Sequence, residues 1–395
     1  MTDLVVQPPR MTETRAMIPM PVTTPTPVTI SVPVSASTAA TTPSGTDAIL
    51  RRTTAAALAP RLWSDGGTGV RVLVTGATGF LGRELVGALR ARGDEVRILA
   101  RSSSRLGDLA GQVEVAHGDV LDPASVAAAV KDRELVFHTA GLVSTLAREH
   151  KRMFQVNVDG TRNVLQAALA AGVKRVVYTS SSYAVGHTLD GRALDETATW
   201  EDPGVAYARS KRRAEEAAFS VAREGLPLVV VNPSFVLGPG GGEGSSGRIV
   251  RRFLDGKMKF YVEGGFSPVD VADVAQGHLA AAEKGRLGER YLLSGENVSF
   301  AQFFSVLSEV AGGPMPKRVP GWFALGATQL QERVLSPLTG KPPVADLDEV
   351  LMGRLIRYFD NSKARAELAF NPRPLRETLE RTVQWMRQAE LSRRD

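Results

Sequence analysis

One tyrosine of the 395-residue chain is followed by a lysine four positions later, in the segment Tyr207-Ala-Arg-Ser-Lys211. The other five tyrosines lack this partner. Residues four apart on a helix lie on one face, so the phenol and the ammonium would be neighbours. A nearby ammonium favours the phenolate and lowers the tyrosine pKa, which would give a proton donor and acceptor near neutral pH. The alternative interpretation is a solvent-facing helix pair.

Three glycines recur at every third position after a short apolar stretch, Val70 to Val74. They are Gly76, Gly79 and Gly82, and helical periodicity follows them. A strand that turns through glycines into a helix directs free N–H groups and the positive end of the helix dipole at one point, which suits a pyrophosphate. The spacing G-x-x-G-x-x-G differs from the usual dinucleotide spacing G-x-G-x-x-G, and an ordinary glycine-rich turn is the alternative.

Hydroxyl side chains follow another predicted strand, at Thr179-Ser180-Ser181-Ser182. In open parallel sheets, ligands bind beyond the carboxyl ends of the strands, so we expect these hydroxyls to face a ligand crevice. Asn157, on the preceding predicted helix, could hold a backbone group or a water near the lysine. Turn formation by the serines and an ordinary helical asparagine are the alternatives.

Strands and helices alternate from Val70 onward, which predicts a parallel sheet covered by helices on both faces. A helix is expected over 155–171, and a long helix between the last two strands of the sheet. After the first strand, the predicted strands are 95–100, 113–116, 135–139, 175–179 and 228–231.

Composition excludes several classes of protein. The chain has no cysteine, so disulfides and thiolate catalysis are excluded. The net charge of +6 is spread along the chain without interleaved aromatic residues, which argues against nucleic acid as a partner. The five histidines form no metal-binding motif, and no apolar stretch approaches the length of a membrane span. We therefore expect a cytoplasmic protein without a catalytic metal.

The rest of the chain divides by composition. Residues 1–69 are rich in Pro and Thr and predicted to be disordered. Residues 70–237 form the predicted nucleotide-binding domain, and residues 238–395 a substrate-binding lobe from which about 258–293 returns to the core. Within that lobe we expect a glycine-rich flexible loop at 238–247, helices at 269–283 and 300–311, a strand at 291–293 and an apolar helix at 322–338.

The apolar helix at 322–338 has three interpretations. Packing on the core is the one we favour. Lining of a lipophilic pocket and peripheral contact with a membrane surface are the others.

Together these motifs resemble the extended short-chain dehydrogenase/reductases, also called the NAD-dependent epimerase/dehydratase family. The resemblance covers about residues 70–388 and is closest to dihydroflavonol-4-reductase-like and hopanoid-associated sugar epimerase members. It rests on Thr75-Gly76-x-x-Gly79-x-x-Gly82, Gly118-Asp119, Asn157-Val158-x-Gly160-Thr161, Thr179-Ser180-Ser181, Tyr207-x-x-x-Lys211 and Asn232-Pro233.

The resemblance implies an α/β fold, a Rossmann-type doubly wound parallel sheet with a smaller C-terminal α/β substrate lobe, and often a homodimer formed through the helix that carries Tyr207 and the preceding strand–helix unit. It makes Tyr207 the acid/base, Lys211 the residue that holds the nicotinamide ribose, and Ser181 the hydroxyl that orients the substrate oxygen. Ser182 is the neighbouring candidate, and Asn157 completes the catalytic set. For cofactor binding the resemblance implies Gly76, Thr78, Gly79, Phe80, Leu81, Gly82, Arg101, Arg105, Asp119, Val120, Ala140, Gly141, Thr179, Asn232 and Ser234. Of these, Asp119 and Val120 would lie at the adenine.

Cofactor choice follows from the end of the second strand. NAD enzymes usually place a carboxylate there for the ribose 2′-hydroxyl. Here the strand is followed by Arg101-Ser102-Ser103-Ser104-Arg105, without an acid. Guanidinium and hydroxyl groups suit a 2′-phosphate. We favour NADP, with NAD as the alternative.

The sequence says less about the class of substrate than about the cofactor. Sugar-nucleotide members commonly carry an arginine in the segment equivalent to 264–270, where this chain has none. Asp270 and Asp273 are expected to stabilise a helix start. We favour reversible hydride transfer between NADP(H) and a carbonyl or secondary alcohol of a small lipophilic molecule, of the dihydroflavonol or 3-hydroxysteroid kind. The alternatives are a sugar epimerase or dehydratase and a silent NADP-sensing protein, against which the Ser–Tyr–Lys set argues.

Overall fold

The computed structural model describes residues 69–241, 246–331 and 347–391. The prediction of disorder for 1–69 lies outside these residues except for Gly69, as do 242–245 of the glycine-rich loop and 332–338 of the predicted apolar helix. The centre is a seven-stranded parallel sheet in the order β11-β6-β5-β4-β1-β2-β3. Its strands are β1 (Arg71–Thr75), β2 (Glu95–Ala100), β3 (Glu114–His117), β4 (Leu135–His138), β5 (Arg175–Thr179), β6 (Leu228–Pro233) and β11 (Arg290–Leu293).

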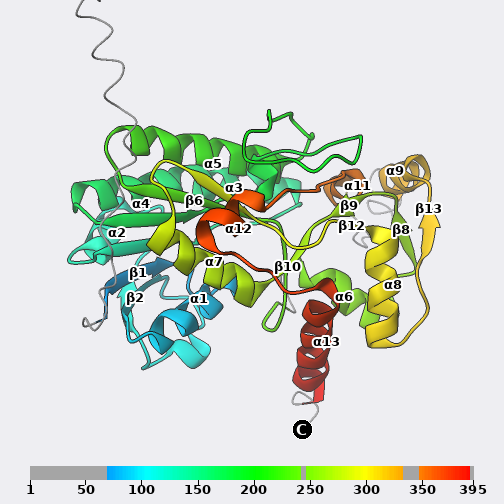
Figure 1. Ribbon diagram of the computed structural model, residues 1–395, viewed down its shortest axis with the longest axis horizontal. Coiled ribbons are helices and arrows are strands. Elements are labelled where there is room, and N and C mark those ends of the chain that lie inside the picture. Colours follow the sequence, from blue (N-terminus) through cyan, green and yellow to red (C-terminus); the bar gives the residue numbers. More distant parts are fainter. Residues whose placement is uncertain (1–68, 242–245, 332–346, 392–395) are drawn as a thin grey trace, which may run out of the picture. The chain divides into compact units, whose positions relative to one another are not determined.

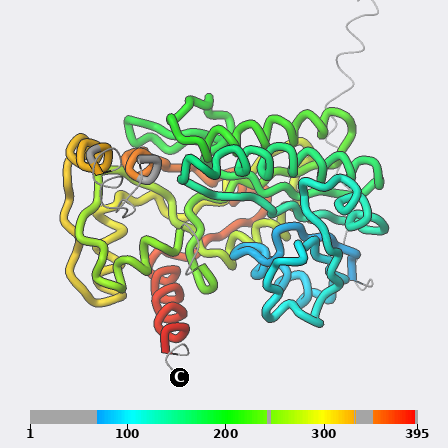
Figure 2. The backbone as a smooth tube through the Cα atoms, turned by 180° about the vertical axis from the view of Figure 1, so that it is seen from behind, coloured from blue at the N-terminus to red at the C-terminus, as the bar shows by residue number. Residues whose placement is uncertain are grey.

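Helices cover both faces of this sheet. On one face lie α1 (Phe80–Ala91) and α7 (Val271–Lys284), which contact each other (Figure 1). On the other lie α2 (Pro123–Val130), α4 (Gly160–Ala170) and α5 (Ala206–Arg223), with α4 between its two neighbours (Figure 2). The doubly wound arrangement predicted from the alternating pattern is confirmed.

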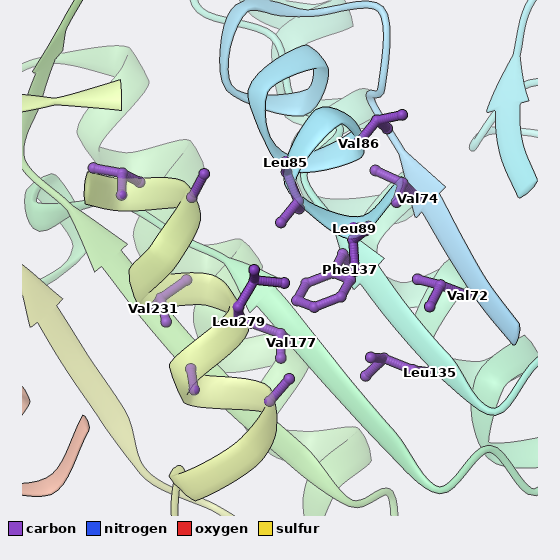
Figure 3. Close-up of a cluster of buried hydrophobic side chains, with 14 of the residues drawn as sticks. Val72, Val74, Leu85, Val86, Leu89, Leu135, Phe137, Val177, Val231 and Leu279 are labelled. Carbon is purple, nitrogen blue, oxygen red and sulfur yellow. The ribbon is translucent and has the colours of Figure 1, made fainter. Parts of the chain in front are cut away.

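Strand β1 shows why the sheet is buried on both faces. Val72 and Val74 point to the α1 and α7 side, where they join the cluster drawn in Figure 3, whereas Leu73 belongs to the cluster beneath α2 and α4. All three side chains are fully buried. Side chains alternate along a strand, so an unbroken apolar run is what a strand between two helix layers requires.

The helix predicted over 155–171 differs from the observed one. The structure has a short α3 (His150–Phe154), a π-helical turn η3 (Gln155–Asp159) and then α4. A π-turn adds a residue to the helical repeat and is often found at functional sites. Asn157 lies within this turn, which sets the direction of its side chain.

The remaining elements form a lobe at one end of the sheet, at the right of Figure 1. It contains three two-stranded pairings, β10–β7, β12–β9 and β13–β8. The lobe comprises β7 (Phe235–Leu237), α6 (Gly247–Leu254), β8 (Phe260–Val262), β9 (Gly265–Phe266), β10 (Pro268–Asp270), β12 (Val298–Ser299), α8 (Phe300–Ala311), β13 (Lys317–Val319), α9 (Gly321–Leu330), α11 (Leu347–Arg354) and α13 (Leu375–Leu391), and α12 (Ser362–Leu368) packs beside α7 and β11.

Element boundaries predicted from sequence shift by one or two residues, at β1, β3, β4, β6, α7 and β11. The prediction that Asp270 stabilises a helix start is confirmed, because its carboxylate caps α7 by accepting the Ala272 N–H at 2.8 Å. In the three described stretches, no helix combines the length and apolarity needed to cross a membrane.

Candidate active site

The phenol of Tyr207 lies close enough to the side chain of Ser181 for Ser181 to lower its pKa. Tyr207 lies in the first turn of α5, and Ser181 caps the short helical turn η4 (Ser182–Ala184) that follows β5. Ser181 Oγ also accepts the Tyr183 N–H at 3.3 Å, which fixes the hydroxyl. Of the two candidate serines, Ser181 is the one whose side chain affects the pKa of the tyrosine. The arrangement presents two hydroxyls together at the carboxyl edge of the sheet.

Lys211 lies one turn further along α5 and is buried, with 5% of its surface exposed. Its Nζ donates to the Thr179 carbonyl at 2.9 Å and lies 5.2 Å from the centre of the Tyr178 ring. Burial lowers the pKa of Lys211 to about 8, while the nearby Glu215 carboxylate raises it. The lysine is therefore held in one place and can change its charge near neutral pH.

The pKa of Tyr207 differs from the sequence expectation. Burial raises it to about 12, and the nearby Ser181 side chain lowers it. The sequence pattern emphasised the ammonium of Lys211, but that group is directed to the Thr179 carbonyl. In this structure the desolvation of the phenol outweighs the charge effect.

Asn157 fixes the chain that follows β4. Its Oδ1 accepts the Leu142 N–H at 2.7 Å, and its Nδ2 donates to the Leu142 carbonyl at 3.0 Å and to Ser210 Oγ at 2.9 Å. A Cβ at Gly141 would lie 3.4 Å from Asn157 Oδ1 and 3.9 Å from Lys211 Nζ. Asn157, Gly141 and Lys211 are thus brought together, as the sequence-based set requires.

A second hydrogen-bond network supports the turn that carries Ser181. Asn232, fully buried at the end of β6, donates through Nδ2 to the Ser181 carbonyl at 3.0 Å and to Glu215 at 2.6 Å. Glu215 also binds Arg290 at 2.8 Å. The turn that carries Ser181 is therefore tied to both β6 and α5. Sequence reasoning missed Glu215, although Tyr207, Lys211 and Glu215 recur at a spacing of four.

The glycine turn between β1 and α1 fits a dinucleotide phosphate. Gly76 has a φ of +73°, and a Cβ there would lie 2.6 Å from the Ala140 amide nitrogen. A Cβ at Gly82 would lie 2.2 Å from the Gly76 carbonyl oxygen. Side chains at these positions would fill the turn, so only glycine lets the backbone and the amino end of α1 present N–H groups to a phosphate.

The end of β2 lies beside this turn, because Thr75 pairs with Leu99. Arg101 and Arg105 are both exposed. Arg83 on α1 donates to the carbonyls of Leu106 and Arg105 at 2.9 and 3.0 Å and so anchors the segment. The two predicted 2′-phosphate ligands therefore stand in solvent next to the glycine turn. Their contact with a phosphate is a prediction that the geometry permits.

The other predicted cofactor residues occupy several environments. Asp119 accepts the Leu121 N–H at 3.0 Å in the turn after β3, and Val120 packs against Gly160. Ser234 donates to the Ser267 carbonyl, so its hydroxyl already has a structural partner. Thr179 Oγ1 is hydrogen-bonded to His278 at 2.8 Å. Thr78, Phe80 and Leu81 are partly buried in the first turn after the strand.

Arg357 is a second residue that sequence reasoning missed. Its guanidinium lies 4.5 Å from the centre of the Tyr183 ring, and that ring meets Tyr207 edge to face at 5.5 Å. Arg357 is 6% exposed, and its Nε has no hydrogen-bond partner among the described residues. No local sequence signal identifies it, because 150 residues of chain separate it from Tyr207.

Comparison with known proteins agrees with this geometry. The profile of the NAD dependent epimerase/dehydratase family matches residues 72–294, which is more than half of the chain. The chain belongs to this family. The matched region runs from β1 to the residue after β11 and so contains the whole seven-stranded sheet.

Individual relatives extend the likeness into the lobe. A putative dihydroflavonol 4-reductase of Synechocystis is 38% identical over 79% of this chain and 93% of its own length. Sterol demethylase protein B of Methylococcus capsulatus is 37% identical over 80% of this chain and 98% of its own. The solved structure of a nucleoside-diphosphate-sugar epimerase from Pseudomonas aeruginosa matches with a TM-score of 0.68 at 30% identity, over 81% and 98% of the two chains.

Proposed function

We propose that this protein is an NADP(H)-dependent oxidoreductase that interconverts a carbonyl and a secondary alcohol on a small lipophilic molecule. The family gives an enzyme that uses NAD or NADP. The observation that carries the finer proposal is the placement of Ser181 next to Tyr207, with Lys211 buried one turn away on the same helix.

The chain's own residues would handle the proton and the oxygen. Ser181 would hold the substrate oxygen, and Tyr207 would donate its proton to that oxygen during reduction and accept it during oxidation. Lys211 would hold the nicotinamide ribose, while Asn157 keeps the chain at Leu142 in place. NADP(H), when bound, supplies or accepts the hydride.

NADP is favoured over NAD by the end of β2. Arg101 and Arg105 are exposed and follow the strand without an intervening acid, so a 2′-phosphate would meet cations and serine hydroxyls there. The nearby Asp108 carboxylate is paired with Arg83. A phosphate at this place would therefore avoid most of the repulsion from that acid.

A lipophilic substrate is favoured by the apolar side chains that pack around Tyr207, which include Leu351, Met352 and Leu355. Val143 and Leu146, which follow the Asn157-bound Leu142, are 45% and 40% exposed. The names of two relatives, a dihydroflavonol reductase and a sterol demethylase protein, refer to lipophilic molecules. Apolar side chains beside a pair of polar groups are typical of a site that binds such a molecule.

Following nicotinamide absorbance with a panel of dihydroflavonol, 3-oxosteroid and aliphatic ketones tests the proposal. We expect NADPH consumption with at least one lipophilic ketone and none with nucleotide sugars. The second candidate, a sugar epimerase, draws on the likeness to the Pseudomonas epimerase structure. Tightly retained cofactor and turnover of a nucleotide sugar without added nicotinamide would establish the epimerase instead.

A homodimer through α5 and the preceding strand–helix unit is the expected assembly, on the resemblance alone. Sedimentation of the purified chain checks it, and a monomer at all concentrations would contradict it.

A further inference from the structure

Aromatic side chains protrude into solvent from the lobe. Trp322 and Phe323, in the first turn of α9, are 74% and 54% exposed, and their rings meet edge to face at 6.0 Å. Phe260 on β8 is 57% exposed. This finding overturns core packing for the start of the helix predicted at 322–338. Exposed large apolar side chains that lie next to each other, as those of Trp322 and Phe323 do, mark an interaction site.

Two lysines lie next to Phe260, at the β8–β13 strand pair that leads into α9. Strand β13 leads directly into α9, and its Lys317 pairs with Phe260 of β8, while the Lys317 N–H donates to the Lys259 carbonyl at 2.9 Å. Lys259 and Lys317 are exposed, and no ion pair is recorded for either among the described residues. We call Lys259, Phe260, Lys317, Trp322 and Phe323 the β8–α9 edge. It combines aromatic groups with positive charge.

The β8–α9 edge is separated from the catalytic tyrosine by one helix. Helix α9 packs on α11, and Gly321 lies so close to α11 that a Cβ there would be 2.7 Å from Arg354 Nε. Helix α11 also places Leu351 and Met352 in the cluster that contains Tyr207. Figure 1 shows α9, α11 and β13 together at the right.

We propose that the β8–α9 edge docks on the surface of an anionic lipid bilayer. Trp322 and Phe323 would enter the boundary between headgroups and acyl chains, where aromatic rings are favoured. Lys259 and Lys317 would contact lipid phosphates, and the net charge of +6 would draw the chain to the surface. Docking would place α11, and the Tyr207 cluster that α11 contacts, next to the lipophilic molecules dissolved in the bilayer. This last step rests on the proposed function, whereas the docking itself does not.

The docking is tested by measuring the fluorescence of Trp322 in the full chain in the presence of lipid vesicles. Vesicles of phosphatidylcholine are compared with vesicles that also contain phosphatidylglycerol, and brominated lipid serves as quencher. We expect a blue shift and quenching with the anionic vesicles only, and loss of both signals in Trp322→Phe, which removes the reporter. A signal that persists in Trp322→Phe, or equal binding to both kinds of vesicle, would overturn the proposal.

Charge and apolar contacts are tested separately by vesicle flotation. Lys259→Gln with Lys317→Gln should weaken binding about thirtyfold, since a lysine near an anionic surface contributes about fivefold. Trp322→Ser with Phe323→Ser should abolish it. The matched controls Lys131→Gln with Lys151→Gln, and Leu287→Ser, should bind as the parent does. NADPH affinity, measured in parallel, should be unchanged in every variant and reports on folding.

Two results distinguish this inference from its alternatives. If the Trp322 signal appears on raising protein concentration without vesicles, the edge joins two copies of the chain and the lipid proposal is wrong. Vesicle binding by a chain that turns over no lipophilic ketone would support the docking and refute the proposed substrate class. Turnover of a lipophilic ketone without vesicle binding would support the proposed substrate class and refute the docking.

Discussion

The cofactor half of the molecule and the lobe that carries α9 and α11 are built by different means. In the first, β1 to β6 pair in parallel register and most of their apolar side chains are fully buried. In the second, short paired strands hold together elements far apart in the chain, and Phe260, Trp322 and Phe323 remain exposed. We propose that the first half positions the reacting groups and that the lobe determines what reaches them.

Because of this difference, we expect the reaction chemistry to depend on the cofactor half and the substrate specificity to depend on the lobe. Ser181 and Lys211 are fixed by hydrogen bonds to the turn after β5 and to β5 itself, and the Tyr207 ring packs against Tyr183. The lobe meets them through a small apolar cluster of Tyr183, Val205, Ala208 and Leu355, with Leu351 and Met352 packed against it. Changes in the cofactor half should therefore affect every substrate, and changes in the lobe should affect only some.

Tyr207→Phe should have the largest effect, because Tyr207 lies where the two regions meet. Loss of the proton donor should lower kcat by about a thousandfold, the usual contribution of general acid–base catalysis. NADPH affinity should change little. Steady-state rates and fluorescence titration check this, with Tyr261→Phe as the control. A variant that keeps most of its rate would remove Tyr207 from the reaction.

Gly82→Ala should abolish cofactor binding, because a Cβ there would lie 2.2 Å from the Gly76 carbonyl oxygen. Gly87→Ala on the same helix is the matched control, since a Cβ there meets nothing within 4 Å. The control should bind NADPH normally and gain up to about 1 kcal/mol in unfolding free energy. Normal NADPH binding by Gly82→Ala would contradict the phosphate turn.

Leu351→Ala tests the lobe. It removes apolar contact with the cluster around Tyr207, so KM for a bulky ketone should rise about tenfold while NADPH affinity is unchanged. Leu254→Ala, a partly buried leucine elsewhere in the lobe, should destabilise the fold without this change in KM. An equal rise in KM in both variants would mean that the effect comes from a general loss of packing in the lobe and not from the lost contact with the Tyr207 cluster.

Glu215→Gln should shift a pH profile. The Glu215 carboxylate raises the pKa of Lys211, which stands at about 8 because burial lowers it. Without the carboxylate that pKa falls, so the alkaline limb of NADPH binding should move to lower pH by about one unit. Glu216→Gln, whose carboxylate pairs with Arg212 on the surface, is the control. An unshifted limb would exclude coupling between Glu215 and Lys211.

The sequence predicted the cofactor half well because its signals are local. The apolar run of β1, the glycine spacing and the Tyr–Lys pair each lie within a few residues, and the α/β fold they indicate is observed. Glu215 and Arg357 were missed, the first because its role depends on Asn232 and Arg290. Arg357 meets Tyr183 only because Arg357 N–H binds the Gly265 carbonyl and Thr188 N–H binds the Ile356 carbonyl, contacts that no sequence pattern records.

The exposed start of α9 could not be predicted for a similar reason. An apolar helix normally packs on a core, and the sequence does not show that α9 meets mainly α11. The pKa of Tyr207 was also predicted in the wrong direction, since the pattern reveals the charge of Lys211 but not the burial of the phenol. Burial is set by the fold as a whole.

The central claim is that the cofactor half binds NADP(H) through the end of β2, and titration of the purified protein with NADPH and with NADH tests it most directly. The account predicts a strong preference for NADPH that falls by at least about tenfold in Arg101→Ala, because a charged hydrogen bond to the 2′-phosphate is lost. Arg192→Ala, also exposed, should keep the preference. Equal or tighter binding of NADH by the parent protein would contradict the account.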